Sequence, residues 1–395
     1  MKLRTLREAP IKKGMRVLLR ADFNEPVSHG KVSDDFRIKT TLPTIKYLLK
    51  KEAKVILISH LGRPLDRAHG KPNGKKDSAF GLAPVAKRLS RLLREKVVLI
   101  KNPFKDFTDK VFIKHRLFLV ENIRFWVEEE KGDLQFARKL SALGDFYIND
   151  AFGASHRAHA SISGIPKFLP HSAGFLLEKE VRALEKLLRS QRRPFFVIFG
   201  GAKASTKIDL VKKYLKEADG VLAGGAIGNT ILAVRGFEIG KSLADHIGKQ
   251  KLKKYINISS LKLFSPLDAV VADKVSANAS FKIVHMGLIR KKEYIVDIGP
   301  ETGRFFAKVL RPAKTILWNG PMGIIEIDKF SHGTLNLVRA MKKIRAYKVT
   351  GGGDTIAFLK KHRLMDVFNH VSTGGGAMME FLAGKKLPGL EALKK

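Results

Sequence analysis

Two glycine tracts near the end of the chain carry a clear chemical signal. Residues 351–353 and residues 374–376 are all glycine, and each tract follows an apolar, strand-like run and precedes a helix-like one. A turn of this kind exposes free backbone N–H groups at the positive end of a helix dipole, and glycine lets an anion approach them closely. Two such turns in succession indicate a cradle for a polyphosphate; tight turns without a ligand are the alternative.

Cations and a carboxylate accompany these turns. The run Gly-Gly-Ala-Lys at 200–203 follows the apolar run 195–199, and it places Lys203 at a predicted helix start with Lys207 one turn later on the same face. The two lysines suit a phosphoryl group in transfer, or they are solvated surface side chains. Asp354 could hold Mg²⁺ that bridges phosphates, or it could cap the helix that follows.

Strand ends in the first half carry charged and polar side chains instead of glycine tracts. Arg, His, Asn and Asp follow four apolar runs there. Guanidinium forks suit a small phosphorylated acid, whereas nests of backbone N–H groups suit a di- or triphosphate. The four apolar runs are residues 17–19, 55–58, 117–120 and 146–148.

The elements that must position these residues follow from the apolar pattern. Short, wholly apolar strands that alternate with helices predict parallel sheets covered on both faces, with ligands beyond the carboxyl ends of the strands. We therefore predict an α/β fold of two doubly wound, Rossmann-like parallel-sheet domains joined by a helix and hinge. The predicted N-terminal domain spans 1–173, the connecting helix 174–190 and the C-terminal domain 191–379.

Composition limits the classes of function. The chain of 395 residues has no cysteine, which excludes disulfides and thiol catalysis, and no run of 18 apolar residues. We expect a soluble, cytoplasmic protein without a membrane partner. The net charge is +38, but residues 1–190 hold 39 Lys and Arg against 21 Asp and Glu, and the remaining residues hold 36 against 16. This even spread argues against a dedicated nucleic-acid face and leaves only weak electrostatic binding to nucleic acid.

Taken together, the motifs resemble those of the phosphoglycerate kinase family, in the family's order, from about residue 14 to about residue 390. They include Arg-Ala-Asp-Phe-Asn at 20–24, Ser-His-Leu-Gly-Arg at 59–63, Gly-Gly-Ala-Lys at 200–203, Trp-Asn-Gly-Pro at 318–321 and both glycine tracts. The resemblance implies reversible, Mg²⁺-dependent phosphoryl transfer from 1,3-bisphosphoglycerate to ADP, which yields 3-phosphoglycerate and ATP. It also implies a monomer, and a tail at 380–395 that packs back on the N-terminal domain.

The resemblance also implies roles for individual residues. The N-terminal domain would bind the triose substrate and the C-terminal domain the nucleotide, with closure about the connecting helix and the stretch 370–385. Asp354 would hold the Mg²⁺. The implied catalytic residues are Arg37, Lys203, Gly352 and Gly375. The implied substrate-binding residues are Asp22, Asn24, Arg37, His60, Arg63, Arg124, His156 and Arg157. The implied nucleotide-binding residues are Gly201, Lys203, Lys207, Gly225, Asn319, Pro321, Glu326, Gly351, Gly352, Gly353, Asp354 and Thr355.

Two departures from the family pattern stand out. Glu25 occupies a position, between Asn24 and Pro26, where the family commonly has an apolar residue. Residues 204–206 are Ala-Ser-Thr, which removes a carboxylate that the family usually has between the two lysines. Two rival hypotheses remain: a basic nucleic-acid-binding protein on a kinase-derived scaffold, and an inactive family member with a structural role.

Overall fold

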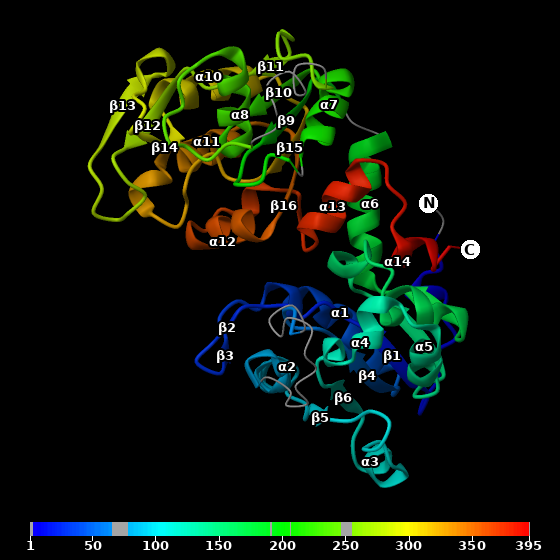
Figure 1. The fold of residues 1–395 in the computed structure, drawn as a ribbon. Coiled ribbons are helices and arrows are strands. Elements are labelled where there is room, and N and C mark those ends of the chain that lie inside the picture. Colours follow the sequence, from blue (N-terminus) through cyan, green and yellow to red (C-terminus); the bar gives the residue numbers. More distant parts are fainter. Residues whose placement is uncertain (1–2, 65–77, 190–191, 206, 246–254, 395) are drawn as a thin grey trace. The chain divides into compact units, whose positions relative to one another are not determined.

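The computed structural model describes residues 3–64, 78–189, 192–205, 207–245 and 255–394. The chain forms two compact units. One runs to Arg182 and includes the residues from Gly384 onward, and the other is Ala183–Ala383 (Figure 1). The helix α6 (Phe175–Arg189), which the sequence predicts as a connection, contains the first boundary.

Unit 1 is built on a six-stranded, wholly parallel sheet with the order β5-β6-β4-β1-β7-β8. Alternate residues of β1, β4 and β6, such as Val17, Val55 and Leu117, share one core with the helices α1 and α2. Leu18 and Ile56, on the opposite face, are buried as well. The sheet is therefore covered on both sides, as the apolar runs predict. The strands are β1 (Arg16–Arg20), β4 (Lys54–Ile58), β5 (Val98–Ile100), β6 (Leu117–Val120), β7 (Phe146–Asn149) and β8 (His171–Ala173).

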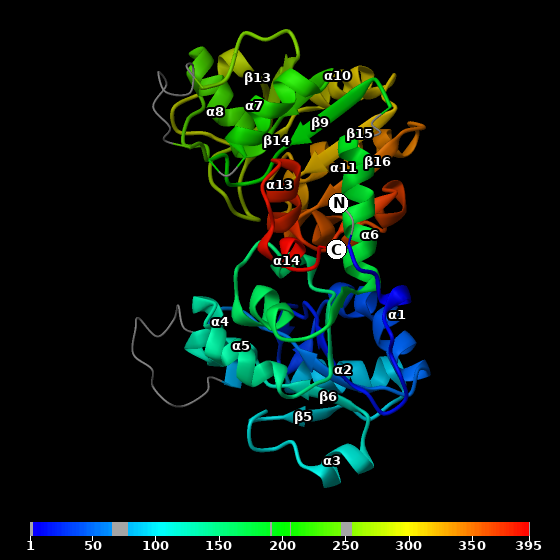
Figure 2. The ribbon, with the colours of Figure 1, turned by 90° about the vertical axis from the view of Figure 1, so that its right-hand side faces the viewer.

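The helices of unit 1 pack through apolar positions at helical spacing. Ile38, Ile45 and Leu48 of α1 are all fully buried, which is the pattern of a helix with one face on a core. In both views α3 lies beside β5 and β6 (Figures 1 and 2). The helices are α1 (Phe36–Lys50), α2 (Ala83–Leu93), α3 (Asp109–Lys114), α4 (Val127–Lys131) and α5 (Leu134–Ser141), and β2 (Val27–Ser28) with β3 (Lys31–Val32) forms a small hairpin.

The end of the chain belongs to unit 1. The helix α14 (Pro388–Glu391) follows the return of the chain to this unit. The Gly389 N–H donates to the carbonyl oxygen of Ser155 at 2.9 Å, and Lys394 forms an antiparallel bridge with Leu3. A Cβ on Gly389 would lie 2.9 Å from the Ser155 Cα, so the segment is closely packed there.

Unit 2 contains a second six-stranded parallel sheet with the order β11-β10-β9-β15-β16-β17. The prediction of two parallel-sheet domains is thereby confirmed. Strands β9 and β15, at its centre, are buried at every position. The strands are β9 (Phe195–Phe199), β10 (Gly220–Ala223), β11 (Leu263–Phe264), β15 (Thr315–Asn319), β16 (Tyr347–Gly351) and β17 (His370–Ser372).

Unit 2 also has a three-stranded antiparallel sheet that the sequence analysis did not predict. It consists of β12 (Asp268–Ala272) between β13 (Phe281–His285) and β14 (Tyr294–Ile298). Strand β13 is exposed at four of its five positions, so it lacks the apolar run that identifies the buried parallel strands. The helices of unit 2 are α7 (Ile208–Glu217), α8 (Gly225–Arg235), α10 (Pro300–Leu310), α11 (His332–Lys342), α12 (Gly353–Lys361) and α13 (Gly375–Leu382). Among the described residues, no helix has both the length and the apolar character needed to cross a bilayer.

Candidate active site

In unit 1, contacts join the loops that follow β1, β4 and β6. The Gly62 N–H donates to Asn24 Oδ1 at 2.8 Å, and Arg124 Nη1 donates to the Gly62 carbonyl oxygen at 2.8 Å. Arg20 Nη2 lies 3.3 Å from His60 Nδ1. The parallel strands end at the same edge of the sheet, so residues far apart in sequence meet there.

Arg37 reaches this edge from the first turn of α1. Its Nη1 donates to the Asn24 carbonyl oxygen at 2.9 Å and lies 3.1 Å from Glu25 Oε2. Its Nε lies 3.9 Å from Asp22 Oδ2. The structure thus brings Arg37, Asp22 and Asn24 together, three residues to which the sequence assigned substrate binding.

Burial and the neighbouring groups together set the protonation of Asp22 and His60. Burial by itself would raise the pKa of Asp22, but the positive charges of Arg37 and Arg20 and the hydrogen bond from the Asn24 N–H outweigh it and hold that pKa below its ordinary value. Burial lowers the pKa of His60 well below its ordinary value, and the charge of Asp22 opposes this only in part. At pH 7 His60 therefore offers a hydrogen-bonding ring and no charge.

The remaining predicted residues of unit 1 lie nearer to solvent. Arg63 and Arg157 are exposed and His156 is half-buried. Arg157 Nε donates to His156 Nε2 at 2.9 Å. Both residues belong to the segment that follows β7, whereas Arg63 follows β4.

One buried network was missed by the sequence analysis. Arg20 is fully buried, and its Nε donates to Ser161 Oγ at 2.8 Å. Ser161 Oγ in turn donates to Glu129 Oε1 at 2.6 Å. The sequence feature that could have revealed this network is an arginine at the last position of an apolar strand. A cation there is expected to be buried, and a buried cation needs hydrogen-bonding partners.

In unit 2, the glycine turns after β9, β10 and β15 bond to one another. The Gly201 N–H donates to the Pro321 carbonyl oxygen at 2.7 Å, and the Gly225 N–H donates to the Met322 carbonyl oxygen at 3.1 Å. The Ala226 N–H donates to the Gly201 carbonyl oxygen at 3.0 Å. A Cβ on Gly225 would lie 2.8 Å from the Gly201 nitrogen, so this turn requires glycine.

The glycine tracts at 351–353 and 374–376 each join a strand to a helix, as predicted. Gly352 has a φ of +114°, which favours glycine, and α12 begins at the next residue. A Cβ on Gly375, the first residue of α13, would lie 2.9 Å from the Gly352 Cα. The amino ends of α12 and α13 are therefore adjacent, and their N-cap residues, Gly352 and Gly374, have no side chain that could cap the helix.

Lys207 and Asn319 lie beside these turns. Lys207 Nζ donates to the Gly200 carbonyl oxygen at 2.5 Å, and Asn319 Nδ2 donates to the Gly351 carbonyl oxygen at 2.8 Å. Thr355 Oγ1 accepts the Gly320 N–H at 3.2 Å. Burial lowers the pKa of Lys207 to about 8, and the charge of Asp354 opposes the shift.

One prediction about the lysines is wrong. The pattern of the sequence predicts Lys203 at a helix start, one turn before Lys207 on the same face. The helix α7 begins only at Ile208, and Lys203 lies ahead of the turn in which the Lys207 N–H donates to the Ala204 carbonyl oxygen. Gly201 has a φ of +82°, outside the helical region, and both lysines precede the helix, so they do not share a helical face.

A cavity of about 450 Å³ adjoins the glycine turns. Gly201, Gly225, Pro321, Glu326 and Asp354 line it, and all five are predicted nucleotide-binding residues. The apolar part of the wall was not predicted, because its side chains come from short, separate segments. That part includes Ala226, Leu243, Val275, Val296, Met322 and Ile324.

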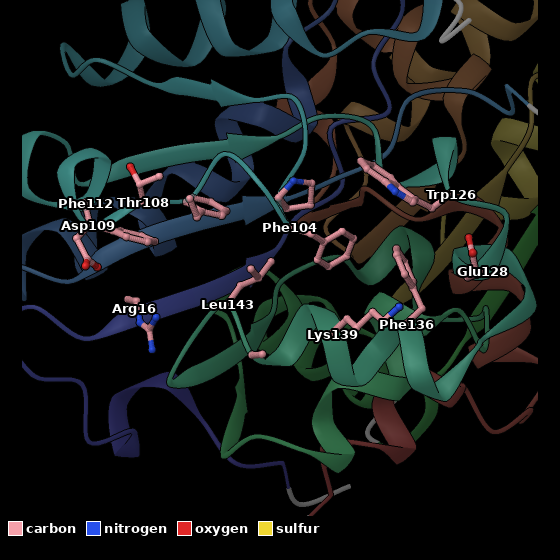
Figure 3. Close-up of a pocket in the computed structure, with 13 residues that line it drawn as sticks. Arg16, Phe104, Thr108, Asp109, Phe112, Trp126, Glu128, Phe136, Lys139 and Leu143 are labelled. Carbon is pink, nitrogen blue, oxygen red and sulfur yellow. The ribbon is translucent and has the colours of Figure 1, made fainter. Parts of the chain in front are cut away.

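A larger cavity, of about 690 Å³, lies in unit 1 beside Arg16, at the amino end of β1. Figure 3 shows Phe104, Trp126 and Phe136 around it, with ring centroids 5.9 to 6.4 Å apart. None of the predicted site residues lines this cavity. It is therefore distinct from the polar cluster at the carboxyl ends of the strands.

Comparison with known proteins agrees with this geometry. The sequence profile of the family described as phosphoglycerate kinase matches residues 8–385. A phosphoglycerate kinase of Pelotomaculum thermopropionicum is 43% identical over 396 residues, which cover 99% of this chain and 98% of that protein. One of Dictyoglomus turgidum is 43% identical over 389 residues, which cover 97% and 96%.

Solved structures give the same result. The phosphoglycerate kinase of Coxiella burnetii superposes with a TM-score of 0.84 at 37% identity, covering 99% of this chain and 98% of that one. That of Pyrococcus horikoshii superposes with a TM-score of 0.85 at 31% identity, with the same coverage. The chain therefore belongs to the phosphoglycerate kinase family and is a phosphotransferase of that family.

Proposed function

We propose that the chain transfers a phosphoryl group reversibly between 1,3-bisphosphoglycerate and ADP, with the triose substrate on unit 1 and the nucleotide on unit 2. The observation that carries this division is the contrast between the two sheet edges. Unit 2 presents two adjacent helix amino ends, which suit a polyphosphate. Unit 1 presents Arg37 among Asp22 and Asn24, which suits a small phosphorylated acid.

On unit 2, the backbone N–H groups of residues 351–353 and of Gly375 would hold the nucleotide phosphates. Lys203 and Lys207 would contact the same phosphates, and Asn319 would lie near them. Glu326 is exposed on the wall of the 450 Å³ cavity, where its carboxylate could accept the ribose hydroxyls. The apolar wall of this cavity would cover the base.

On unit 1, Asp22 and Asn24 would bind the hydroxyl and carboxyl region of the triose. Arg37 would face the group in transfer. Four further side chains would surround the distal phosphate and the carboxyl group with hydrogen-bond donors. These are Arg63, Arg124, His156 and Arg157, with His60 as a neutral member of the cluster.

The residues of unit 2 fit a magnesium ion that is shared with the nucleotide. Asp354 lies in the first turn of α12 and is exposed. The described residues contain no group of three or more His, Cys, Asp or Glu that could hold an ion by themselves. A single carboxylate together with phosphate oxygens is a common arrangement for Mg²⁺, which when bound neutralises charge on those oxygens.

The chemical step needs charge stabilisation more than proton transfer. A β-phosphate oxygen of ADP attacks the phosphorus of the acyl phosphate, and the bond from phosphorus to the carboxyl oxygen breaks. The leaving carboxylate and the attacking oxygen are both ionised, so no general base is required. Arg37, Lys203 and the amino ends of α12 and α13 would stabilise the negative charge on the transferred group.

The transfer requires the two substrates to meet, so we infer a closing motion. The chain passes between the units twice, within α6 between Arg182 and Ala183 and again between Ala383 and Gly384. Gly384 has a φ of +82°, a conformation that suits a change of direction. These two passages are the proposed hinges, and closure would expel water from the reacting groups.

A coupled assay tests the activity directly. The purified chain should form ATP from 1,3-bisphosphoglycerate and ADP, and the reverse reaction should consume ATP with 3-phosphoglycerate. Omission of Mg²⁺ with a chelator present should abolish the turnover, because the phosphate charges would then lack their counterion. Absence of turnover in both directions with Mg²⁺ present would support the hypothesis of an inactive family member.

The pKa of Lys207 predicts a pH dependence of nucleotide binding. In the free protein the lysine is a cation below about pH 8 and loses its charge as the pH rises through that value. The affinity for ADP should therefore fall about fivefold between pH 8 and pH 9, as the protonated fraction of Lys207 falls from about one half to about one eleventh. Titration calorimetry across this range measures the effect. Lys207→Arg should have a flat profile because guanidinium does not titrate there; identical profiles for the two proteins would contradict the assignment.

A further inference from the structure

Glu25 is a buried carboxylate that the proposed function does not use. It lies between Asn24 and Pro26, and only 3% of its surface is exposed. Its two oxygens contact two different groups of the same residue. Oε1 accepts the backbone N–H of Arg37 at 2.5 Å, and Oε2 lies 3.1 Å from Arg37 Nη1.

This double contact fixes both ends of one arginine. The Arg37 N–H belongs to the first turn of α1, where a carboxylate interacts favourably with the helix dipole. The Arg37 Nη1 belongs to the guanidinium, which a charge-assisted hydrogen bond orients within its plane. Arg37 has a long side chain with many rotamers, so a partner that holds both its backbone and its tip restricts where the guanidinium can point.

The charges around Glu25 show that this carboxylate also depends on Arg37. Burial raises the pKa of Glu25, and the charge and backbone N–H of Arg37 oppose that rise. Asp34 and Asp22, the other charged groups that act on Glu25, raise its pKa further. Arg37 is thus the cation that makes a carboxylate tolerable in this position.

We propose that Glu25 is a positioning residue that holds the guanidinium of Arg37 ready for the group in transfer. This inference rests on the proposed role of Arg37. Glu25 itself would touch neither substrate.

The variant Glu25→Gln should keep one of the two contacts with Arg37 and remove the other. The amide oxygen can still accept the Arg37 N–H, but the amide nitrogen is a donor and cannot accept from Nη1. We expect kcat to fall about tenfold, the typical cost of losing one hydrogen bond to a charged group. KM for 3-phosphoglycerate should change less than about threefold, since positioning acts on the chemical step.

Asp35→Asn is the matched control. Asp35 also lies at the start of α1, but it pairs with Arg88 Nη2 at 2.5 Å and with Lys39 Nζ at 3.0 Å. This variant should lower the melting temperature at least as much as Glu25→Gln and leave kcat unchanged. Equal losses of kcat in the two variants would mean that Glu25 only stabilises the helix.

A double-mutant cycle with Arg37→Ala decides whether Glu25 acts through Arg37. If it does, Glu25→Gln should cost nothing further in the Arg37→Ala background. Independent, multiplicative losses would overturn the inference, as would a kcat for Glu25→Gln equal to or above that of the unchanged protein. If Arg37→Ala alone left kcat intact, the proposed role of Arg37 in the reaction would be wrong. That single variant therefore distinguishes an error about Arg37 from an error about Glu25.

Discussion

Arg37→Ala should lower kcat for phosphoryl transfer by about 10²- to 10³-fold, the usual cost of removing one group that stabilises charge in a transition state. The structure places the guanidinium at the carboxyl end of β1, with Nη1 2.9 Å from the Asn24 carbonyl oxygen. A methyl group at this position offers no donor. Steady-state kinetics in both directions of the reaction measure the loss.

A matched control removes an arginine without touching the site. Arg116→Ala, in the same unit, breaks an exposed ion pair with Glu95 at 2.7 Å and should leave kcat unchanged. Arg37→Lys should recover only part of the rate, because an ammonium lacks the planar fork of a guanidinium. A kcat within threefold of normal in Arg37→Ala would remove this arginine from the mechanism.

Gly375→Ala should lower kcat/KM for ADP by about 10²-fold, because a small displacement of positioned groups has an effect of that size. The added Cβ would lie 2.9 Å from the Gly352 Cα and 3.3 Å from its nitrogen. Both are backbone atoms, so the two turns would have to move apart. The helix amino ends would then no longer converge on one anion.

The control for this variant is a glycine elsewhere in unit 2. Gly303 lies inside α10, and an added Cβ there meets nothing within 4 Å. Gly303→Ala should therefore keep full activity and raise the stability slightly, since alanine favours a helix. Normal nucleotide kinetics in Gly375→Ala would show that the phosphates bind away from the two glycine turns.

Much of the fold could be predicted because the buried parallel strands are recognisable locally. Runs such as 195–199 are apolar at every position and end in glycine or in polar residues, which a strand buried on both faces requires. The antiparallel sheet could not be predicted in this way. Strand β13 follows β12 after a short connection, but it is mostly exposed and therefore lacks the continuous apolar run that identifies the buried strands.

The sequence by itself determined which residue types end each strand. It indicated a guanidinium-rich edge in one half and glycine turns in the other, because strand ends are local features that periodicity and glycine reveal. The resemblance to the family drew attention to Glu25 but indicated no partner for it.

Only the tertiary structure decided how these groups act on one another. The pKa of His60 falls because the fold buries it, and the carboxylate of Glu25 holds Arg37 because α1 begins beside the loop after β1. Lys203 does not lie on a helix, because α7 begins five residues later, at Ile208. Burial and through-space contact depend on which segments the chain packs together, and that information is not contained in any short stretch of sequence.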